Sequence, residues 1–271
     1  MNGRRWAVAV LLIGAAAMLL TPGASAGEQK TVLVFSLTKG FRHDDAIKVG
    51  NPLLQKAAEE LGYKCIIRED PAMFDPDKIK QFACIIFNNT TGDLFPEKEP
   101  GGKERREAFM AHIKAGCGFI GIHAATDCLY NLPEYGKMIN GYFDGHPWSQ
   151  KVKAIIEDPQ HPIMKPFGGT SWECQDEIYA FRNYDRTAAR ILMRLDNTSI
   201  DVTKGKRADK DYAMCWIRMC EKGRVMYQAF GHGGNVFKKP EYMESTKVAI
   251  RWACGDLEVD MTPSKPLPAQ Q

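Results

Sequence analysis

The feature that most constrains the fold is an alternation of short apolar runs with helical segments through the first half of the chain. Apolar runs typical of buried strands lie at 31–37, 63–68, 84–88 and 118–123, and segments with apolar residues at helical spacing lie at 46–61, 76–81, 105–115 and 133–140. Parallel strands need a crossover connection, which is usually a helix. The order therefore predicts a mostly parallel sheet with helices on both faces.

The second half of the chain is less regular. Strand-like runs follow one another at 151–157, 178–181, 189–195, 213–219 and 224–230, and a helical segment closes the fold at 241–253. Short strands in succession predict an antiparallel extension beside the parallel core. We expect one α/β domain over residues 27–257, followed by a loose tail at 258–271 that is rich in proline and polar residues.

Residues 1–26 have the three parts of a signal peptide. Arg4 and Arg5 form a basic start, residues 6–20 are apolar, and Ala24-Ser25-Ala26 is a cleavage site of small residues. The sequence thus predicts export, with the mature protein periplasmic or secreted. The apolar run is shorter than the roughly 20 residues that cross a bilayer, and no later run is long and apolar enough, so we expect no stable membrane insertion.

The charge balance argues against a nucleic acid partner. Removal of Arg4 and Arg5 with the signal peptide leaves 34 basic residues against 33 acidic ones. No cluster of basic residues is present that could neutralise a run of phosphates.

The eight cysteines show no spacing typical of a metal site or a redox dithiol, because no C-x-x-C pair occurs. Several lie inside apolar strand-like runs, for example Cys65 and Cys84. Buried free thiols are the favoured interpretation, and one or two disulfides remain an alternative.

The stretch from Gly118 to Asp127 places a titratable ring at the end of a buried strand. The apolar run ends at His123, and the small residues that follow predict a helix start with Thr126 or Asp127 as its cap. Ligands of open α/β sheets bind outside the carboxyl ends of the strands. His123 is therefore a candidate site residue, although a buried histidine bonded to backbone would fit this stretch equally well.

Two further histidines share this position. His43 follows the first predicted strand, and His232 follows the strand at 224–230. If these strands are parallel to the one before His123, all three rings lie at one edge of the sheet, which favours a functional role over a structural one. Gly231 and Gly233 beside His232 would let a ligand approach the backbone.

Seven segments, in order, resemble the ThuA-like (trehalose utilisation) family, and the resemblance covers residues 31–255. They are Phe41-Arg42-His43, Gly121 to Asp127, Gly141 to Trp148, His161 to Ile163, Asp176 to Tyr179, Gly223 to Tyr227 and Gly231-His232. The resemblance implies a fold similar to class I glutamine amidotransferases, a flavodoxin-like three-layer α/β sandwich. It also implies a role in carbohydrate catabolism, including pathways through 3-keto-glycosides.

The resemblance does not extend to a cysteine nucleophile. In the amidotransferase relatives, a cysteine occupies the tight turn after the central strand and a histidine follows a later strand; His123 and His232 stand at these positions here. Cys117 precedes the strand and Cys128 lies beyond the turn, so neither is placed for thiolate chemistry. A hydrolase that uses one of these thiols remains a third alternative.

By the resemblance, Asp127, His146 and Glu177 join the three histidines as candidate catalytic residues. One chemistry is acid/base catalysis, in which one group removes the proton next to a ketone and another protonates the departing glycosidic oxygen. The other is a divalent metal such as zinc, held by the converging imidazoles and able to polarise the keto oxygen. The two chemistries are compatible.

Substrate-binding candidates are Arg42, Tyr142, Trp148 and the glycines Gly231 and Gly233. Both aromatic rings are also compatible with core positions. The adjacent carboxylates Asp176 and Glu177 are either a paired acid/base device or a solvated turn, and His112 and His161 are most simply surface and turn residues.

The sequence therefore predicts an exported enzyme, a lyase or hydrolase, that processes an oxidised sugar or glycoside. The alternative is a non-catalytic carbohydrate-binding or accessory module. Both have a small-molecule carbohydrate as partner, and the oligomeric state is not predicted.

Overall fold

The structure, a computed structural model, describes residues 29–268, so the predicted signal peptide lies outside the described residues. The strands are β1 (Thr31–Phe35), β2 (Lys64–Arg68), β3 (Phe82–Asn88), β4 (Gly118–Ile122), β5 (Tyr142–Phe143), β6 (Trp148–Ile156), β7 (Ser171–Ile178), β8 (Phe181–Arg182), β9 (Arg190–Leu195), β10 (Ala213–Cys220) and β11 (Gly223–Gln228). The α-helices are α1 (Asp44–Glu60), α2 (Gly102–Ala115), α3 (Pro133–Ile139), α4 (Gly234–Phe237) and α5 (Pro240–Ala253). Single 3₁₀ turns lie at Pro71–Phe74, Ile79–Gln81, His123–Thr126, Lys165–Phe167, Arg186–Ala188, Asn197–Ser199 and Val202–Lys204.

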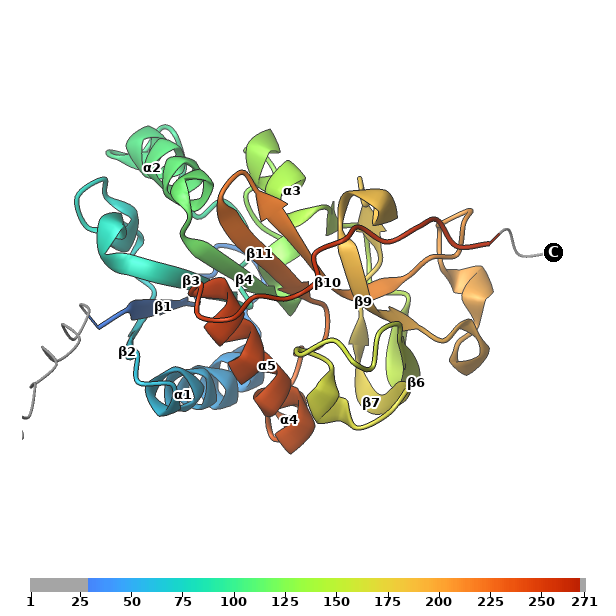
Figure 1. Cartoon of the computed structure of the whole chain (residues 1–271). Helices are drawn as coiled ribbons and strands as arrows, with labels where there is room; N and C mark the ends of the chain where they lie inside the picture. The colour runs from blue at the N-terminus through green and yellow to red at the C-terminus, as the bar shows by residue number, and fades with distance from the viewer. Residues whose placement is uncertain (1–28, 269–271) are drawn as a thin grey trace, which may run out of the picture.

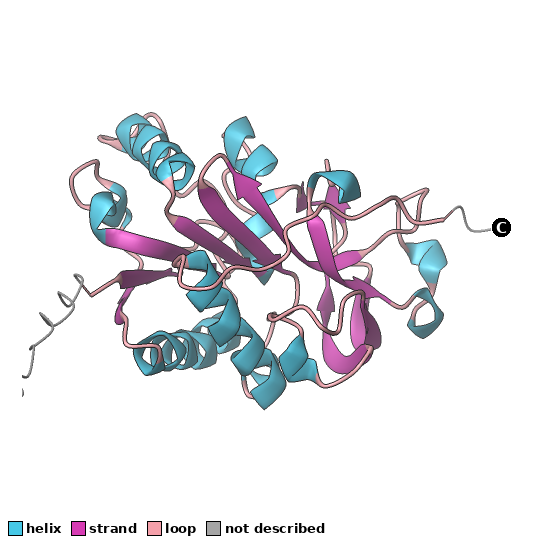
Figure 2. Cartoon of the chain, in the orientation of Figure 1, coloured by secondary structure: helices cyan, strands magenta, loops and turns pink. Residues whose placement is uncertain are grey.

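One sheet of nine strands runs through the molecule in the order β2-β1-β3-β4-β11-β10-β9-β6-β7. The first five strands are parallel, and each later neighbour pairs antiparallel. Helices α1, α4 and α5 cover one face, and α2 and α3 cover the other (Figures 1 and 2). The predicted α/β sandwich with an antiparallel extension is confirmed.

The central strands are buried on both faces, which explains why they read as continuous apolar runs. Every residue of β1 and β4 is buried. Gly118 begins β4 where α5 ends against it, and a Cβ atom there would lie 2.3 Å from the carbonyl oxygen of Ala253. The glycine thus permits the close approach of helix and strand that closes this layer.

The antiparallel extension bends back toward the parallel half. Although β7 is the far edge strand, the Nδ2 of Asn235 on α4 donates to the carbonyl of Gln175 at 2.8 Å, and the Nε1 of Trp172 donates to Glu241 at 2.8 Å. Because β6, β9 and β10 alternate in direction, β7 runs in the same sense as β4. The end of β7 therefore reaches the carboxyl edge of the parallel strands.

The predicted strand at 178–181 is wrong. Ile178 ends β7, and Phe181 begins β8, which pairs with β5 in a separate two-stranded sheet. Between them the backbone of Ala180 turns to bond residues 144 and 145. The run is apolar because the ends of two different strands are both buried there.

The predicted helix start at Thr126 or Asp127 is also wrong. The chain makes one 3₁₀ turn at His123–Thr126, and α3 begins only at Pro133, with no side-chain cap. In between, Cys128 forms a parallel bridge with Gly92, which extends the sheet contact between the loops after β3 and β4. The predicted helix at 76–81 is likewise only a 3₁₀ turn at Ile79–Gln81.

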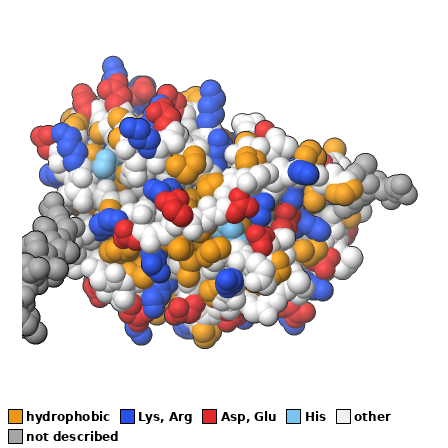
Figure 3. All heavy atoms as spheres, viewed as in Figure 1, with side chains coloured by type: hydrophobic (Ala, Val, Ile, Leu, Met, Phe, Trp, Pro, Cys, Tyr) orange, Lys and Arg blue, Asp and Glu red, His pale blue; other side chains and the backbone are white. Residues whose placement is uncertain are grey.

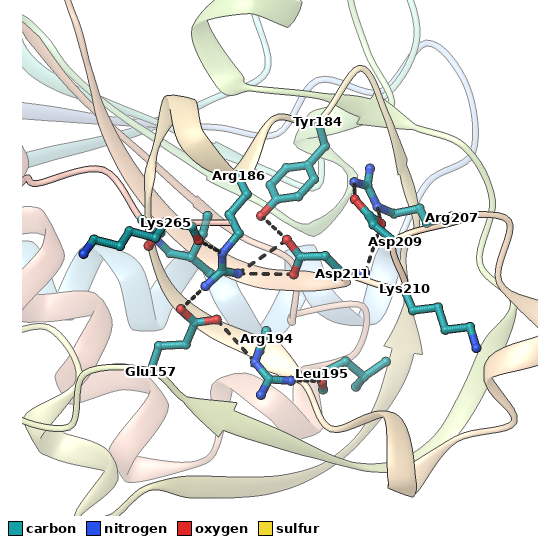
Figure 4. A network of polar contacts seen from close by, with 12 residues as sticks. Glu157, Tyr184, Arg186, Arg194, Leu195, Arg207, Asp209, Lys210, Asp211 and Lys265 are labelled. Carbon is teal, nitrogen blue, oxygen red and sulfur yellow. Dashed lines mark hydrogen bonds and ion pairs between the residues drawn. The ribbon is translucent and has the colours of Figure 1, made fainter. Parts of the chain in front are cut away.

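A network around Arg186 holds the extension together (Figure 4). Arg186 pairs with Glu157 and Asp211, and Glu157 also pairs with Arg194 at 3.4 Å. The Nε of Arg186 donates to the carbonyl of Lys265 at 2.7 Å. The C-terminal segment, which we expected to be loose, is therefore bonded to the domain at this point, and it runs past β10 and β9 (Figure 1).

All eight cysteines, which lie between residues 65 and 254, are free thiols and none is exposed. On the face shown in Figure 3, Lys and Arg side chains alternate with Asp and Glu, without a cluster of one sign. Within residues 29–268, no helix combines the length and the apolar character that crossing a membrane would require.

Candidate metal centre

Four side chains meet at the carboxyl edge of the parallel strands. His43 follows β1 and immediately precedes α1, His123 follows β4, His232 follows β11, and Glu177 lies near the end of β7. Each offers one ligand atom, and these atoms all lie within 4.8 Å of one another. The prediction that the three histidines converge is confirmed. Glu177 joins them because the antiparallel extension bends back toward this edge of the sheet.

The distances between three of these atoms fit a metal coordination shell. His123 Nε2 lies 3.3 Å from His232 Nδ1, which lies 3.3 Å from Glu177 Oε1. Glu177 Oε1 lies 3.7 Å from His123 Nε2. Ligands bound tetrahedrally to zinc are roughly 3.3 Å apart, because each lies about 2.0–2.1 Å from the ion. Small movements would complete the shell with His43.

The backbone fixes the orientation of the His123 ring. Its Nδ1 lies 2.8 Å from the carbonyl oxygen of Ala229, which can only accept, so Nδ1 carries the proton and Nε2 faces the cluster as a lone pair. The residue has φ 47°, in the left-handed region, and the Tyr227 hydroxyl donates to its carbonyl at 2.7 Å. Such outer contacts are typical of metal-binding histidines.

The loop that carries His232 is held by buried side chains. Asp176 Oδ2 accepts from the backbone N–H groups of Gly231 at 2.7 Å and His232 at 3.4 Å. Asn89 Nδ2 donates to the Gly231 carbonyl at 3.1 Å. Gly231 has φ 124°, and a Cβ atom there would lie 2.9 Å from Ile122, so the fold itself requires glycine at this position. The sequence predicted that a ligand approaches this backbone. Instead, the Gly231 N–H donates to Asp176 of the protein itself.

Asp176 and Glu177 do not form a paired-carboxylate device. They are consecutive residues of β7, so their side chains point to opposite faces of the strand. Glu177 faces the histidines, whereas Asp176 is 5% exposed and bonds the His232 loop. The alternative of a solvated turn is equally wrong, because both residues belong to a strand.

Electrostatics set two of the four side chains, Glu177 and His43, in the protonation state that a metal requires, whereas the hydrogen bond with Glu177 raises the pKa of His232. Burial raises the pKa of Glu177, but its contacts with His123 and His232 outweigh this effect, so the pKa lies well below its usual range. Burial, reinforced by the other two imidazoles, lowers the pKa of His43 to about 3. At neutral pH the cluster thus contains a carboxylate and a neutral His43, whose buried Nδ1 has no hydrogen-bond partner among the described residues.

His146 and Asp127 lie at the rim of the cluster. His146 Nδ1 is 3.6 Å from Glu177 Oε2, and its side chain is 56% exposed. Asp127 accepts from the Tyr130 hydroxyl at 2.5 Å, and burial raises the pKa of its carboxyl group. Both side chains lie where a bound small molecule can contact them or the residues beside them. Neither is one of the four converging side chains.

Three predicted substrate-binding residues have other partners. Trp148 is 1% exposed and its Nε1 donates to the Asp201 carbonyl at 2.9 Å, so its ring is part of the core and cannot stack on a sugar. Tyr142 is also buried, with its hydroxyl 2.8 Å from the Leu132 carbonyl. Arg42 is bound to Glu69 at 2.7 Å and stabilises the loop before His43.

Gly233 has an extended backbone, and a Cβ atom there would lie 2.6 Å from Asn235 Oδ1. Because that oxygen is the end of a side chain that can move, packing does not require glycine at position 233, in contrast to position 231. Gly231 therefore needs no ligand to explain it, whereas packing does not explain Gly233.

Sequence reasoning missed three residues around the cluster. Asp176 was seen only as a neighbour of Glu177. The Tyr179 ring lies 4.0 Å from the His123 ring, and the Phe41 ring lies 4.9 Å from that of His43. The only available signal was their adjacency to the chosen residues, because contacts across the sheet leave no mark in the sequence.

The two cysteines near β4 are placed away from this chemistry. Cys128 contacts Ala125, Thr90 and Tyr135, and burial raises the pKa of its thiol to about 12. Cys117 precedes β4, at the opposite end of the strand from His123, and burial raises its pKa as well. Neither thiol is activated.

Comparison with known proteins places the chain in a family. The family model described as ThuA, trehalose utilisation, matches residues 31–253. No curated protein sequence matches the chain.

Solved structures support the same fold. A ThuA-like protein from Bacteroides uniformis superposes with a TM-score of 0.67 at 20% identity, covering 86% of this chain and 95% of that one. A ThuA-like protein from Parabacteroides merdae gives 0.62 at 15% identity over 89% and 94% of the two chains. A cytoplasmic protein from Salmonella typhimurium gives 0.52 at 12% identity over 81% and 97%.

Proposed function

Because the chain belongs to the ThuA family of trehalose utilisation proteins, we propose that it is a metal-dependent enzyme that acts on a carbohydrate. The four converging side chains His43, His123, Glu177 and His232 are the ligands. The observation that carries this proposal is their spacing, with all four ligand atoms within 4.8 Å of one another.

The ligand set indicates the kind of metal. Three imidazoles and one carboxylate suit zinc or another divalent transition metal, and a soft thiolate is not among them. The proton on His123 Nδ1 is directed to the Ala229 carbonyl, which leaves its Nε2 free for coordination. His43 and His123 are 5% and 0% exposed, so a ligand reaches the centre from the side of His146 and His232.

We propose an oxidised sugar, a 3-keto-glycoside, as the substrate class. The ketone acidifies the proton on carbon 2; a base removes that proton, the electron pair forms the carbon 1–carbon 2 double bond, and the carbon 1–oxygen bond breaks. The departing oxygen takes a proton from an acid. The products are an unsaturated keto-sugar and the free alcohol, and the bound ion stabilises the negative charge on the keto oxygen.

Two rim residues fit the proton transfers. His146 is exposed, and its imidazole has a ring nitrogen that can accept a proton. Burial raises the pKa of Asp127, which favours its protonated form as the acid. We also propose export of the mature protein, supported by the composition of residues 1–26, with the periplasm or the cell exterior as its place of action.

The first test is metal content. The full-length protein is purified without an affinity tag, and its metals are measured by elemental analysis beside the triple variant His43→Ala/His123→Ala/His232→Ala and the control His112→Ala. His112 lies on α2, where its Nε2 bonds the Phe82 carbonyl at 2.8 Å, remote from the cluster. We expect about one divalent ion per chain in wild type and control and none in the triple variant. Equal metal in all three proteins would refute the site.

The second test is turnover of 3-keto-glycosides, prepared chemically from simple glycosides. His146→Ala should lose about 10²–10⁴-fold in kcat while its metal content is unchanged. The alternative, a non-catalytic binding module, predicts saturable sugar binding with no turnover in any variant.

A further inference from the structure

Exposed aromatic rings are concentrated at the metal centre. Among residues 29–268, the exposed large hydrophobic side chains are Phe41 at 68%, Tyr130 at 40% and Met219 at 40%. Phe41 lies two residues before His43, and Tyr130 lies three residues after Asp127. Leaving a phenylalanine in water forgoes the free energy of burying its ring, so its place beside the site needs an explanation.

The loop that presents Phe41 is fixed on both sides of the ring. The Thr91 hydroxyl donates to the Phe41 carbonyl at 2.8 Å and accepts from the Gly40 N–H at 3.2 Å. The next residue, Arg42, binds Glu69 through two hydrogen bonds of 2.7 and 3.0 Å. The ring is therefore held in place while most of its surface is open to solvent, as expected of a preorganised contact surface.

The ring also adjoins the ligand set directly. Its centroid lies 4.9 Å from that of His43, with the planes at 81°, so the two rings meet edge to face. His43 in turn packs against His123 and His232 at 5.0 and 4.9 Å. A molecule that lies on Phe41 therefore lies next to the metal centre.

Tyr130 has a matching position on the other side. Its hydroxyl donates to Asp127, the Arg182 guanidinium lies 4.7 Å from its ring centroid, and Tyr142 packs against it at 5.1 Å. The loops that carry the two rings are related by sheet-like bridges. Thr38 bridges to Thr91, and Gly92 bridges to Cys128, so the loops after β1, β3 and β4 lie side by side. With neighbouring strands about 4.8 Å apart, Thr38 and Cys128, which lie in the loops that carry Phe41 and Tyr130, are about 10 Å apart.

We propose that Phe41 and Tyr130 are sugar-binding walls on either side of the metal centre, and that the ligand is a glycoside with at least two pyranose rings. This inference rests on the proposed function in one respect, that the site takes a carbohydrate. A pyranose packs the apolar C–H groups of one face on an aromatic ring while its hydroxyl groups bond polar side chains. The two loops are separated by two strand spacings at Thr38 and Cys128, a distance that two linked pyranose rings fill better than one.

The surroundings favour a sugar over a second copy of the chain. Asp127, His146 and Arg182 lie among the aromatic residues, so the exposed rings are separated by polar groups and do not form one apolar patch. Large contiguous apolar patches mark protein interfaces. Isolated rings with polar neighbours suit a ligand that is itself partly polar.

The test is calorimetric titration of the full-length protein with trehalose, maltose and methyl α-glucoside. The variants are Phe41→Ala, Tyr130→Leu and Tyr130→Phe, and the control is Met219→Ala, which removes the remaining exposed hydrophobic side chain from β10. We expect wild type to bind a disaccharide at least tenfold more tightly than the monosaccharide. Phe41→Ala and Tyr130→Leu should each weaken disaccharide binding at least tenfold, whereas Tyr130→Phe, which keeps the ring, and Met219→Ala should not.

Three results would overturn the inference. In the first, wild type binds none of the three sugars. In the second, Phe41→Ala and Tyr130→Leu bind the disaccharides as tightly as wild type does. In the third, wild type is a dimer that Phe41→Ala dissociates, and sugar binding does not change. Metal content measured in the same samples separates this inference from the proposed function. A protein without metal whose sugar binding depends on Phe41 would refute the metal centre alone.

Discussion

The Arg186 network and the histidine cluster are both partly buried groups of polar side chains, but they differ in how completely the chain satisfies them. In the network, Arg186 has a carboxylate on either side and a backbone carbonyl as well (Figure 4). In the cluster, three imidazoles converge on the single carboxylate of Glu177, and the buried Nδ1 of His43 has no partner.

The difference separates structure from function. A network of matched charges stabilises the fold, since Glu157 and Asp211 each face an arginine, although the buried Oε1 of Glu157 has no hydrogen bond. A cluster with lone pairs directed at one point is costly for the fold and becomes favourable only when a cation is bound. A hollow of about 580 Å³ beside the network, lined by Tyr184, Arg207 and Pro266 among others, is thus a weaker candidate site than the histidine cluster.

The largest expected effect is on the network. Arg186→Met leaves Asp211 and Glu157 without their shared cation, and we expect the free energy of unfolding to fall by about 3–5 kcal/mol. Metal content should not change. Chemical denaturation measures the effect, and Arg207→Met is the matched control, because its partner Asp209 is 55% exposed and the loss there should be about 0–1 kcal/mol. Equal losses in the two variants would contradict the structural role of Arg186.

The next prediction concerns the cluster. Zinc at a hundredfold excess over its Kd should stabilise wild type by about 2.7 kcal/mol, because it binds only the folded chain. His232→Ala should abolish this gain and leave the stability of the metal-free protein nearly unchanged, since the ring is 38% exposed. Thermal unfolding with and without zinc measures both. A metal-free His232→Ala protein much less stable than wild type would make the cluster structural, like the network.

A smaller effect on zinc affinity is expected at Asp176, which holds the His232 loop but offers no ligand atom to the cluster. Asp176→Ala removes the acceptor of the Gly231 N–H, and zinc affinity should fall about 10–100-fold, the usual effect of losing an outer-shell contact. Asp176→Asn, which keeps an oxygen acceptor, should restore part of the affinity. Glu173→Ala, on the solvent side of the same strand, is the control. Competition titration with a zinc chelator gives the affinities; no change in Asp176→Ala would show that Asp176 does not position His232.

The last prediction concerns pH, and its effect accumulates over several pH units. In the metal-free protein the pKa of His43 is about 3, against 6.5 for an ordinary histidine, so the unfolded chain binds a proton in this range that the folded chain does not. The contribution is fully present above pH 6.5 and is lost as the pH falls toward 3, by at most about 1.4 kcal/mol per pH unit. Denaturation of wild type and His43→Leu between pH 7 and about 4 measures it. Parallel stability curves for the two proteins would contradict the buried neutral state of His43.

Much of the fold could be predicted from sequence, because the parallel strands are buried on both faces and appear as continuous apolar runs. The position of three histidines at one sheet edge followed from that order alone. The role of Glu177 could be taken only from the family resemblance, because β7 reaches the site through curvature of the extension, which no local pattern records. Gly231 and Trp148 show the converse, since both were assigned to a ligand and both are required by packing.

The error at Thr126 and Asp127 has a similar origin. Polar residues after a strand suggested a helix cap, but the left-handed backbone of His123 and the bridge from Cys128 to Gly92 direct the chain along the sheet first. Long-range pairing therefore outweighed local capping preference.

The most direct test of the central claim is the position of a metal in a crystal of the full-length protein soaked in zinc, located by anomalous diffraction at the zinc absorption edge. We predict one strong peak bonded to His43, His123, His232 and Glu177, at about 2.0–2.2 Å from each ligand atom. A map with no peak among these four side chains, or with zinc bound only elsewhere on the surface, would contradict the metal centre.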